Sequence, residues 1–252
     1  MTRFAPLAAL ALPLALAACG DPATDAGTEA TDLDVATTDG EAAAMNRAMV
    51  TSDFASLELG AKIEGPQGPE PVGRLTTQEG AFADMKSYVA CPEGMDTCDP
   101  ATAPEGTIYT YVHTVFPGED NDPSTGSGDG ADSSDVEIAN AFKTTRPAYG
   151  FTGAIGYSEG ELLAAVGEKA RMIVTCGEEG QLVWTIDAGD GGDQWEQAEP
   201  ITFWWQSTLP PAGPQEAYAI QANRTTATGP GPFPDAKEGV RNACMVPAQN
   251  GS

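Results

Sequence analysis

The sequence predicts an all-β fold, specifically a disulfide-stapled antiparallel β-sandwich with one short helix near residues 159–166. From about Thr51 onward, short runs rich in Val, Ile, Thr, Tyr, Phe and Trp recur between clusters of Gly, Pro and Asp, a texture typical of sandwiches and barrels. Four cysteines in this region can form two disulfides. Roughly 200 residues suit one large sandwich or two small ones. No linker divides them cleanly, so we expect one domain.

Eight runs have the length and composition of β-strands. In chain order they are residues 54–63, 82–90, 107–116, 148–156, 170–176, 181–187, 201–209 and 217–223. The run 107–116 alternates with a period of two, and its two sets of side chains are Ile108, Thr110, Val112, Thr114 and Phe116 on one face and Tyr109, Tyr111, His113 and Val115 on the other. Both sets are bulky, so we expect this strand to be central and covered on both faces.

The first 18 residues have the form of an export signal. Arg3 precedes an apolar run from Phe4 to Ala18, which is shorter than the roughly 20 residues that a spanning helix needs. The run ends in Leu16-Ala17-Ala18-Cys19, which resembles the lipobox of bacterial lipoproteins. The resemblance covers about the first 20 residues. It implies cleavage before Cys19, a lipid on its thiol, and a place in the cell envelope, with Gly20 favouring the outer membrane.

Residues 19–50 are predicted to form an acidic disordered tether between this anchor and the folded domain, 51–252. The stretch 19–41 holds seven acids, no base and almost nothing to bury, so it cannot offset the entropy lost on ordering. The whole chain has 37 Asp and Glu against 12 Lys and Arg. We therefore expect no nucleic-acid partner, because such binding rests on neutralising phosphates. A long acidic loop is expected at 117–135.

The chain has five cysteines, an odd number that leaves one unpaired if the others form disulfides in an exported protein. If Cys19 carries lipid, then Cys91, Cys98, Cys176 and Cys244 remain, and an oxidising compartment favours two disulfides. We expect Cys91–Cys98, since the six residues between them can form a tight loop, and hence Cys176–Cys244. A zinc site is the rival interpretation, but the chain has one histidine and no CxxC.

The stretch GYSEG at 156–160 fits the G-x-S-x-G pattern of a serine-hydrolase nucleophile elbow. In α/β-hydrolases the histidine follows the serine, whereas the only histidine here, His113, precedes Ser158. A His-Asp-Ser order through an acid such as Asp120 is formally open, but the GDSGG of that family is missing. A capping box explains more, since Ser158 stands three residues before Glu161 at the start of a helix that Gly167 ends.

The remaining candidate sites use carboxylates and indoles. Calcium takes six to eight oxygens, at about 2.3–2.6 Å, and two Gly-rich segments could supply them, with Asp120, Asp122, Asp129, Asp132 and Asp135 in one and Asp187, Asp190 and Asp193 in the other. Neither segment matches the EF-hand spacing, so solvated loops are the simpler interpretation.

Trp204 and Trp205 must point to opposite faces of their strand. One of them could stack on a sugar, although core packing accounts for both. His113 could act as a lone base or metal ligand, or it could be packed.

The sequence favours a non-catalytic binding module for an envelope protein or glycan, held at the membrane by its lipid. No catalytic residue and no cofactor other than calcium is expected. A carboxylate-dependent hydrolase of cell-wall or external polysaccharide is the first alternative, because two acids suffice for glycoside chemistry. A structural envelope component is the second. Fold class by itself does not decide among these functions.

Overall fold

The computed structural model describes residues 49–77, 80–118, 136 and 138–245. The expected signal (1–18), almost all of the expected tether (19–50) and most of the expected acidic loop (117–135) lie outside these residues. The described residues belong to one compact unit.

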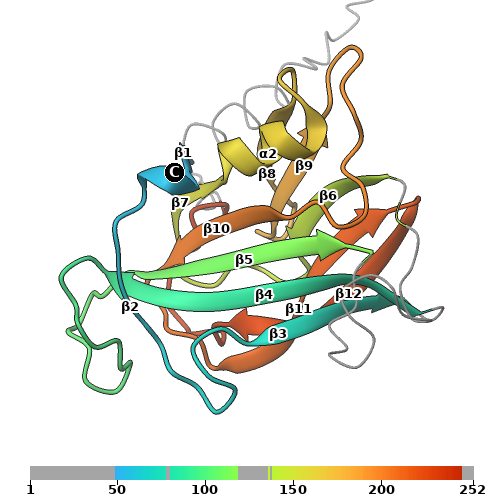
Figure 1. Cartoon of the computed structure of the whole chain (residues 1–252). Helices are drawn as coiled ribbons and strands as arrows, with labels where there is room; N and C mark the ends of the chain where they lie inside the picture. Colours follow the sequence, from blue (N-terminus) through green and yellow to red (C-terminus); the bar gives the residue numbers. More distant parts are fainter. Residues whose placement is uncertain (1–48, 78–79, 119–135, 137, 246–252) are drawn as a thin grey trace, which may run out of the picture. The chain divides into compact units, whose positions relative to one another are not determined.

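The described chain forms a single sheet of twelve strands with one α-helix and one 3-10 turn (Figure 1). The strand order is β1-β7-β10-β5-β4-β3-β12-β11-β6-β9-β8, and β2 pairs with β4 beside this path. The bounds are β1 Val50–Asp53, η1 Phe54–Ser56, β2 Leu59–Lys62, β3 Val72–Thr77, β4 Gly80–Pro92, β5 Tyr109–Pro117, β6 Ala139–Thr144, β7 Phe151–Tyr157, α2 Glu159–Val166, β8 Arg171–Cys176, β9 Leu182–Asp187, β10 Ile201–Ser207, β11 Gly213–Ala222 and β12 Thr225–Phe233.

The prediction of a mostly β fold with one short helix and two disulfides is confirmed, but the sandwich is corrected. Hydrogen-bonded pairing runs without a break from β1 to β8, so there is one sheet instead of two stacked ones. That sheet curls until it is nearly closed, and it is barrel-like. All its pairings are antiparallel except β1 with β7. Twisted strands and strongly bent ones such as β4 allow a sheet this wide to curl.

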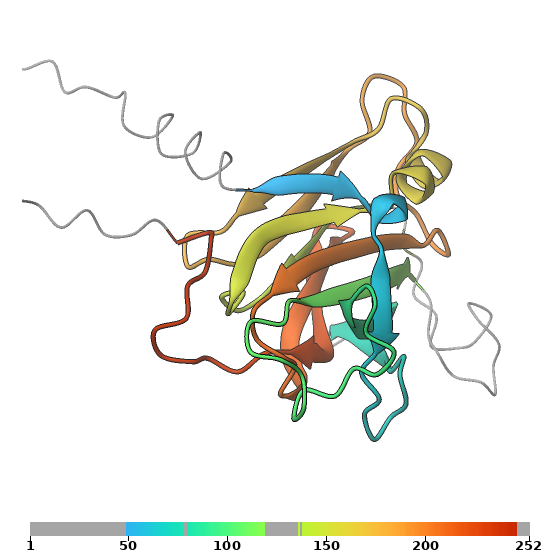
Figure 2. The ribbon, with the colours of Figure 1, turned by 90° about the vertical axis from the view of Figure 1, so that its left-hand side faces the viewer.

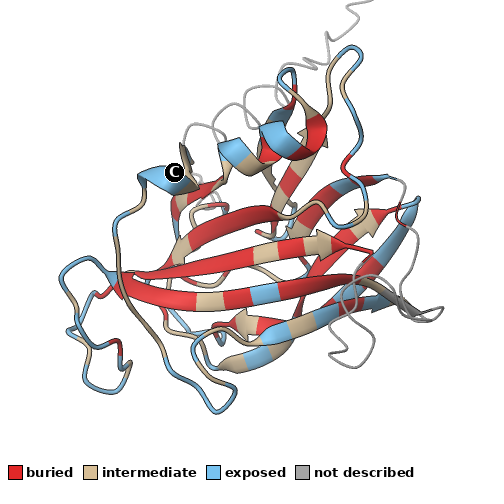
Figure 3. Cartoon of the chain, in the orientation of Figure 1, coloured by how far each residue is buried: buried red, intermediate tan, exposed pale blue. Residues whose placement is uncertain are grey.

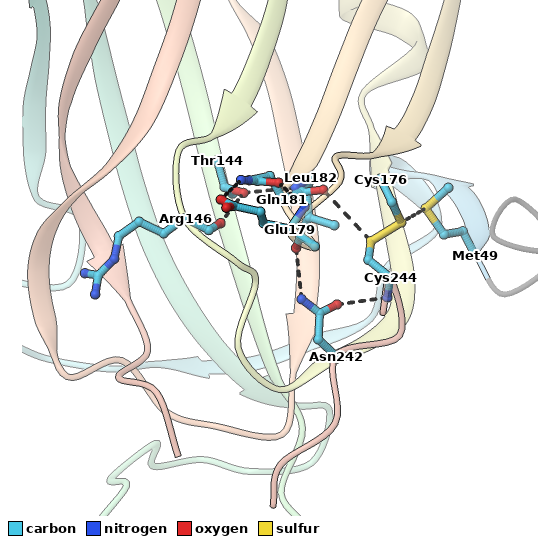
Figure 4. The surroundings of a disulfide bond; sticks show 10 residues. Met49, Thr144, Arg146, Cys176, Glu179, Gln181, Leu182, Asn242 and Cys244 are labelled. Carbon is cyan, nitrogen blue, oxygen red and sulfur yellow. Dashed lines mark hydrogen bonds between the residues drawn. A yellow bond between two sulfur atoms is a disulfide. The ribbon is translucent and has the colours of Figure 1, made fainter. Parts of the chain in front are cut away.

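The sheet ends at β1 and β8. Side chains and the C-terminal segment connect β7, next to the first end, with β9 and β8 at the other end, and Figure 4 shows the disulfide at β8. The Trp184 indole donates from β9 to the Gly156 carbonyl of β7 at 2.9 Å. The Ala243 amide donates to the Phe151 carbonyl of β7 at 3.0 Å, and the next residue forms the Cys176–Cys244 disulfide with the end of β8. The disulfide thus ties the two ends of the sheet to one short segment.

The interior is filled by aromatic side chains from strands on opposite sides of the sheet. The Phe142 ring stacks on Phe203 at 4.8 Å and on Tyr218 at 5.8 Å between ring centroids. The Tyr111 ring stacks on Trp205 at 4.4 Å. Strands β10, β5 and β4 are buried along most of their length (Figure 3). Side chains of this size fill the space inside a curled sheet, and each contributes about 1.5–3 kcal/mol by leaving water.

Strand β5 is central and covered on both faces, as its two bulky sets of side chains predict. Residues 54–63 cross the outer face of the neighbouring strands (Figure 2). Val112 and Trp204 are opposite each other in register, and both are buried. Gly156 lies beside them, and a Cβ at this position would stand 1.9 Å from the Ser52 carbonyl oxygen. Glycine is therefore required where β1 lies against β7.

Seven of the eight expected strands correspond to a single observed strand each. The run 54–63 is corrected, because it divides into the turn η1 and the short strand β2. Strands β1, β3, β6 and β12 were not expected. The last of these reads TTATGPGPF, and alternating Gly and Pro normally argue against a strand. It is tolerated because β12 is registered with β3 at a single pair, Thr228 with Thr76.

Candidate functional site

Ser158 is a helix cap. Its hydroxyl accepts a hydrogen bond from the Glu161 amide at 3.4 Å, at the start of α2. Gly167 ends the helix with a φ of 105° and donates its amide to the Leu163 carbonyl. The expected helix at 159–166 has these bounds in the structure.

The reciprocal half of the capping box is corrected. The Glu161 carboxylate does not return to Ser158 but accepts from the Thr202 amide of β10 at 2.6 Å. The Ser158 amide in turn donates to the Thr202 carbonyl at 2.8 Å. These two hydrogen bonds fasten the start of the helix to β10.

His113 lies in the interior of the barrel-like sheet with no exposed surface. Its Nδ1 is 2.9 Å from the Ser87 hydroxyl on the neighbouring strand. Its ring packs on Tyr218 at 4.2 Å between centroids. Burial lowers the pKa of His113 to about 3, because the charged imidazolium would lose its hydration.

Ser87 and His113 are brought together, yet they lack the properties of a catalytic pair. A general base works best with a pKa near the working pH, and a histidine with a pKa of about 3 binds a serine proton too weakly. Ser87 is itself 1% exposed. The packed interpretation of His113 is the one that its surroundings support.

The two adjacent tryptophans do not offer a stacking face. Trp204 is 2% exposed and Trp205 is fully buried, the first under the crossing segment and the second in the aromatic interior. Trp184 and Trp195 are also fully buried. The prediction that a strand directs its neighbours to opposite faces is confirmed, but both faces of this strand are covered.

The described acidic residues do not converge on a metal site. Asp187 forms an ion pair with Arg171 at 3.0 Å and accepts from the Gly189 amide, and Asp193 accepts from its neighbour Gln194. Among the described residues there is no group of three or more His, Cys, Asp or Glu that could hold a metal. The Asp190 backbone carbonyl accepts from the Lys169 ammonium at 2.9 Å. The remaining calcium candidates lie outside the described residues: Asp120, Asp122, Asp129, Asp132 and Asp135.

Both disulfides have the expected pairing. Cys91–Cys98 closes a short loop beside β2 and β4, and Cys176–Cys244 closes the gap in the sheet. Cys19 lies outside the described residues.

The described residues form an apolar pocket of about 370 Å³. Three segments far apart in the sequence meet there: the loop before β3, the β10–β11 turn and the end of β12. We call it the proline pocket, because six of its fourteen lining residues are prolines. Its lining consists of Ile63, Gly65, Pro66, Gln67, Gly68, Pro69, Pro71, Tyr88, Val89, Pro211, Ala212, Gly213, Pro214 and Pro232.

An ion-pair network fixes one wall of the proline pocket. Glu70, in the wall loop 63–71, forms ion pairs with both Lys62 of β2 and Lys86 of β4. The Lys62 ammonium also lies 3.9 Å from the ring centroid of Tyr88. Hydrogen bonds from Lys62 and then Lys86 lower the pKa of Glu70 to about 2. Burial, and then the Glu70 charge, raises the pKa of Tyr88 to about 12.

The lining of the proline pocket is poor in hydrogen-bond donors. Its six prolines have no N–H group. Three other lining amides are already used, since Ile63 donates to Val89, Gly68 to Gly65 and Ala212 to Phe233. Proline also fixes its own φ, so these walls lose little freedom when a ligand binds.

Two neighbouring hollows share residues with the proline pocket. One, of about 620 Å³, shares Ile63 and Pro69 and carries three carboxylates, those of Glu64, Asp96 and Asp99. The other, of about 60 Å³, lies between β3 and β12 and is lined by, among others, Ser87. Both hollows therefore adjoin walls of the proline pocket.

The sequence of the wall segments indicates only rigid turns. The stretches GPQGPEPVG (65–73) and LPPAGP (209–214) have the composition of Pro-stiffened loops. Their shared composition is the one available signal, because Pro-rich turns at the same end of a sheet make rigid walls. The two segments meet because of the strand order, and the hydrophobic periodicity of the sequence does not reveal that order.

No helix in the described part of the chain is long and apolar enough to cross a membrane. No protein-family model matches the chain, and searches of curated proteins and of solved structures found no match either.

Proposed function

We propose that this protein is a lipid-anchored binding module of the bacterial envelope, and that its proline pocket binds a segment of another envelope protein. The observation that carries this proposal is the pocket itself, which is apolar, largely preformed and built on a disulfide-stapled sheet. Rigid walls favour binding, because little conformational entropy is lost when the partner docks.

A binding role is favoured over catalysis by the chemistry of the lining. Tyr88 is the only titratable residue among those that line the proline pocket in the described structure, and its raised pKa keeps it protonated at neutral pH. A protein is favoured over a glycan because sugars need both donors and acceptors. The lining is donor-poor, and all four tryptophans are buried.

The anchor and the envelope location rest on the signal-like first 18 residues and Cys19. Replacing the anchoring cysteine, Cys19→Ala, is expected to release the protein from the membrane fraction. Unchanged fractionation of this variant would contradict the anchor without bearing on the pocket.

Site-specific photo-crosslinking in the native envelope tests the pocket. A benzophenone amino acid at Gln67, on the pocket wall, is expected to capture a discrete partner. The same probe at Leu163, 36% exposed on α2, is the matched control. Capture through position 67 should disappear when Gly65→Trp fills the pocket and persist in Gly160→Trp. Both glycines have open space around the added Cβ.

Equal capture at both probe positions, or capture that survives Gly65→Trp, would refute the binding role of the pocket.

The alternative function, a hydrolase, has one specific observation in its favour. Glu58 and Glu93 share a side-chain hydrogen bond, which raises the pKa of Glu93. Both residues are exposed and neither lines the hollows described above, so this pair supports catalysis less than the pocket supports binding.

A further inference from the structure

We infer that the proline pocket takes an aromatic side chain, Tyr or Trp, from an extended, basic segment of the partner protein. This inference rests on the proposed binding function and names the chemistry of the bound segment. The walls, the hydrogen-bonding groups, the charges and the shape of the concave surface each contribute one part of it.

The walls favour an aromatic ring. Proline side chains present flat faces of C–H groups, and the negative face of an aromatic ring is attracted to the positive edge of such groups. Proline side chains come from both sides of the pocket, Pro66 and Pro69 from the wall loop and Pro211 and Pro214 from the β10–β11 turn. A volume of about 370 Å³ is sufficient for an indole or phenol together with part of its backbone.

The hydrogen-bonding groups favour a ligand that donates. The six prolines have no N–H, and the Ile63, Gly68 and Ala212 amides are already bonded. The Pro71 and Pro232 carbonyls accept from the Ser87 amide and the Tyr218 hydroxyl, so the acceptors left to a ligand are the carbonyls of the other four prolines. An anionic group would find few donors here, and a buried polar group without a partner costs affinity. Tyr and Trp combine an apolar ring with an O–H or N–H donor.

The charges favour a basic segment. The hollow next to the proline pocket carries the carboxylates of Glu64, Asp96 and Asp99. Lys62 also lines this hollow, but its charge is paired, since Lys62 and Lys86 both form ion pairs with Glu70. The whole chain has a formal net charge of −25, so its field attracts cations and repels anions.

The shape favours an extended chain over a compact ligand. The proline pocket shares lining residues with two other hollows: Ile63 and Pro69 with the acidic hollow, and Pro71 among others with the hollow between β3 and β12. An extended peptide can place an aromatic side chain in the centre and a basic one in the acidic hollow.

Three peptide probes test this inference: KGWGK, the leucine analogue KGLGK and the charge-reversed EGWGE, each capped at both ends. The full chain carrying Cys19→Ala is titrated while the amide NMR signals of Gly65, Gln67, Gly68 and Ala212 are followed. KGWGK is expected to shift these signals and to bind about tenfold more tightly than KGLGK. Relative to EGWGE it should bind roughly fivefold more tightly at low salt, and this difference should shrink in ~0.5 M salt.

Binding should be lost in Gly65→Trp and kept in Gly160→Trp. Equal binding of KGLGK would overturn the aromatic preference, and equal or tighter binding of EGWGE would overturn the basic preference. If no probe shifts the signals while position 67 still captures a partner in the envelope, the inference fails and the proposed function stands. If the probes and the crosslinking both fail, the proposed function fails too.

Discussion

The hydroxyl of Ser87 lies 2.9 Å from Nδ1 of His113, in the interior of the sheet and away from any charged partner that the described structure shows. Two residues that would suggest catalysis in a cleft are here held among Phe142, Tyr218 and the neighbouring strands. Burial keeps His113 neutral. The free energy of unfolding therefore depends on pH.

The free energy of unfolding is expected to fall as the pH is lowered from about 6.5 toward 3. The pKa of His113 is about 3 in the folded protein and about 6.5 when unfolded. The unfolded chain therefore binds a proton that the folded one does not, which costs up to about 1.4 kcal/mol per pH unit in this window. Urea unfolding at pH 7, 6 and 5 measures this slope. In His113→Phe the slope between pH 6.5 and 5 should flatten, and an unchanged slope would assign it to other groups.

Glu70→Gln is expected to loosen the wall of the proline pocket. The substitution removes the charge that holds Lys62 and Lys86. All three side chains are about a third to a half exposed, so the loss of stability should be about 1 kcal/mol or less, while capture through position 67 should fall. Glu70 has a lowered pKa, so its contribution is complete above pH ~4.5 and is lost as the pH falls toward 2.

Glu168→Gln is the control for Glu70→Gln, because Glu168 is an exposed acid outside the three hollows, with no ion pair shown among the described residues. Thermal melting and crosslinking yield should both be unchanged by this control. Equal effects of the two substitutions would mean that the net charge of the protein matters instead of the ion pairs of Glu70.

Removal of the Cys176–Cys244 disulfide should open the gap in the sheet. The double variant Cys176→Ser/Cys244→Ser releases a loop with a sequence separation of 68 residues and should lose about 4 kcal/mol on the loop-entropy model. Hydrogen exchange at the Ala243 amide, which bonds to β7, should accelerate.

The other disulfide supplies the comparison. Cys91→Ser/Cys98→Ser opens a separation of 7 residues and should lose about 2.5 kcal/mol, with no change in exchange at Ala243. Faster exchange there in both variants would show that the gap is not closed by Cys176–Cys244 in particular.

Glu161→Ala should destabilise the protein more than Ser158→Ala. Loss of the Ser158 cap costs about 1 kcal/mol, and Ser158→Asn should restore most of it. Loss of the Glu161 carboxylate leaves the buried Thr202 amide without its acceptor, which costs about 1–3 kcal/mol. Chemical denaturation of the three variants measures both effects. The reverse order would indicate that helix capping outweighs the bond to β10.

Much of the local structure followed from neighbouring residues in the chain. The helix of 159–166 was predicted at its observed bounds because its cap, its apolar residues and Gly167 all lie within ten positions. Most strands were recognised from their β-branched and aromatic content. Strand β12 was not predicted, because glycine and proline at 229–232 have no strand propensity. The strand forms because it pairs along its length with β11, while a single pair registers it with β3.

The sequence by itself determined that this is a β-rich chain with one capped helix and four cysteines suited to two disulfides, since period, capping and cysteine number are local or countable properties. The tertiary structure decided that the strands form one nearly closed sheet, that Trp204, Trp205 and His113 are buried, and that three proline-rich segments meet in a pocket. These features depend on strand order and register. Both are set by side-chain packing summed over residues far apart in the chain, which no short pattern records.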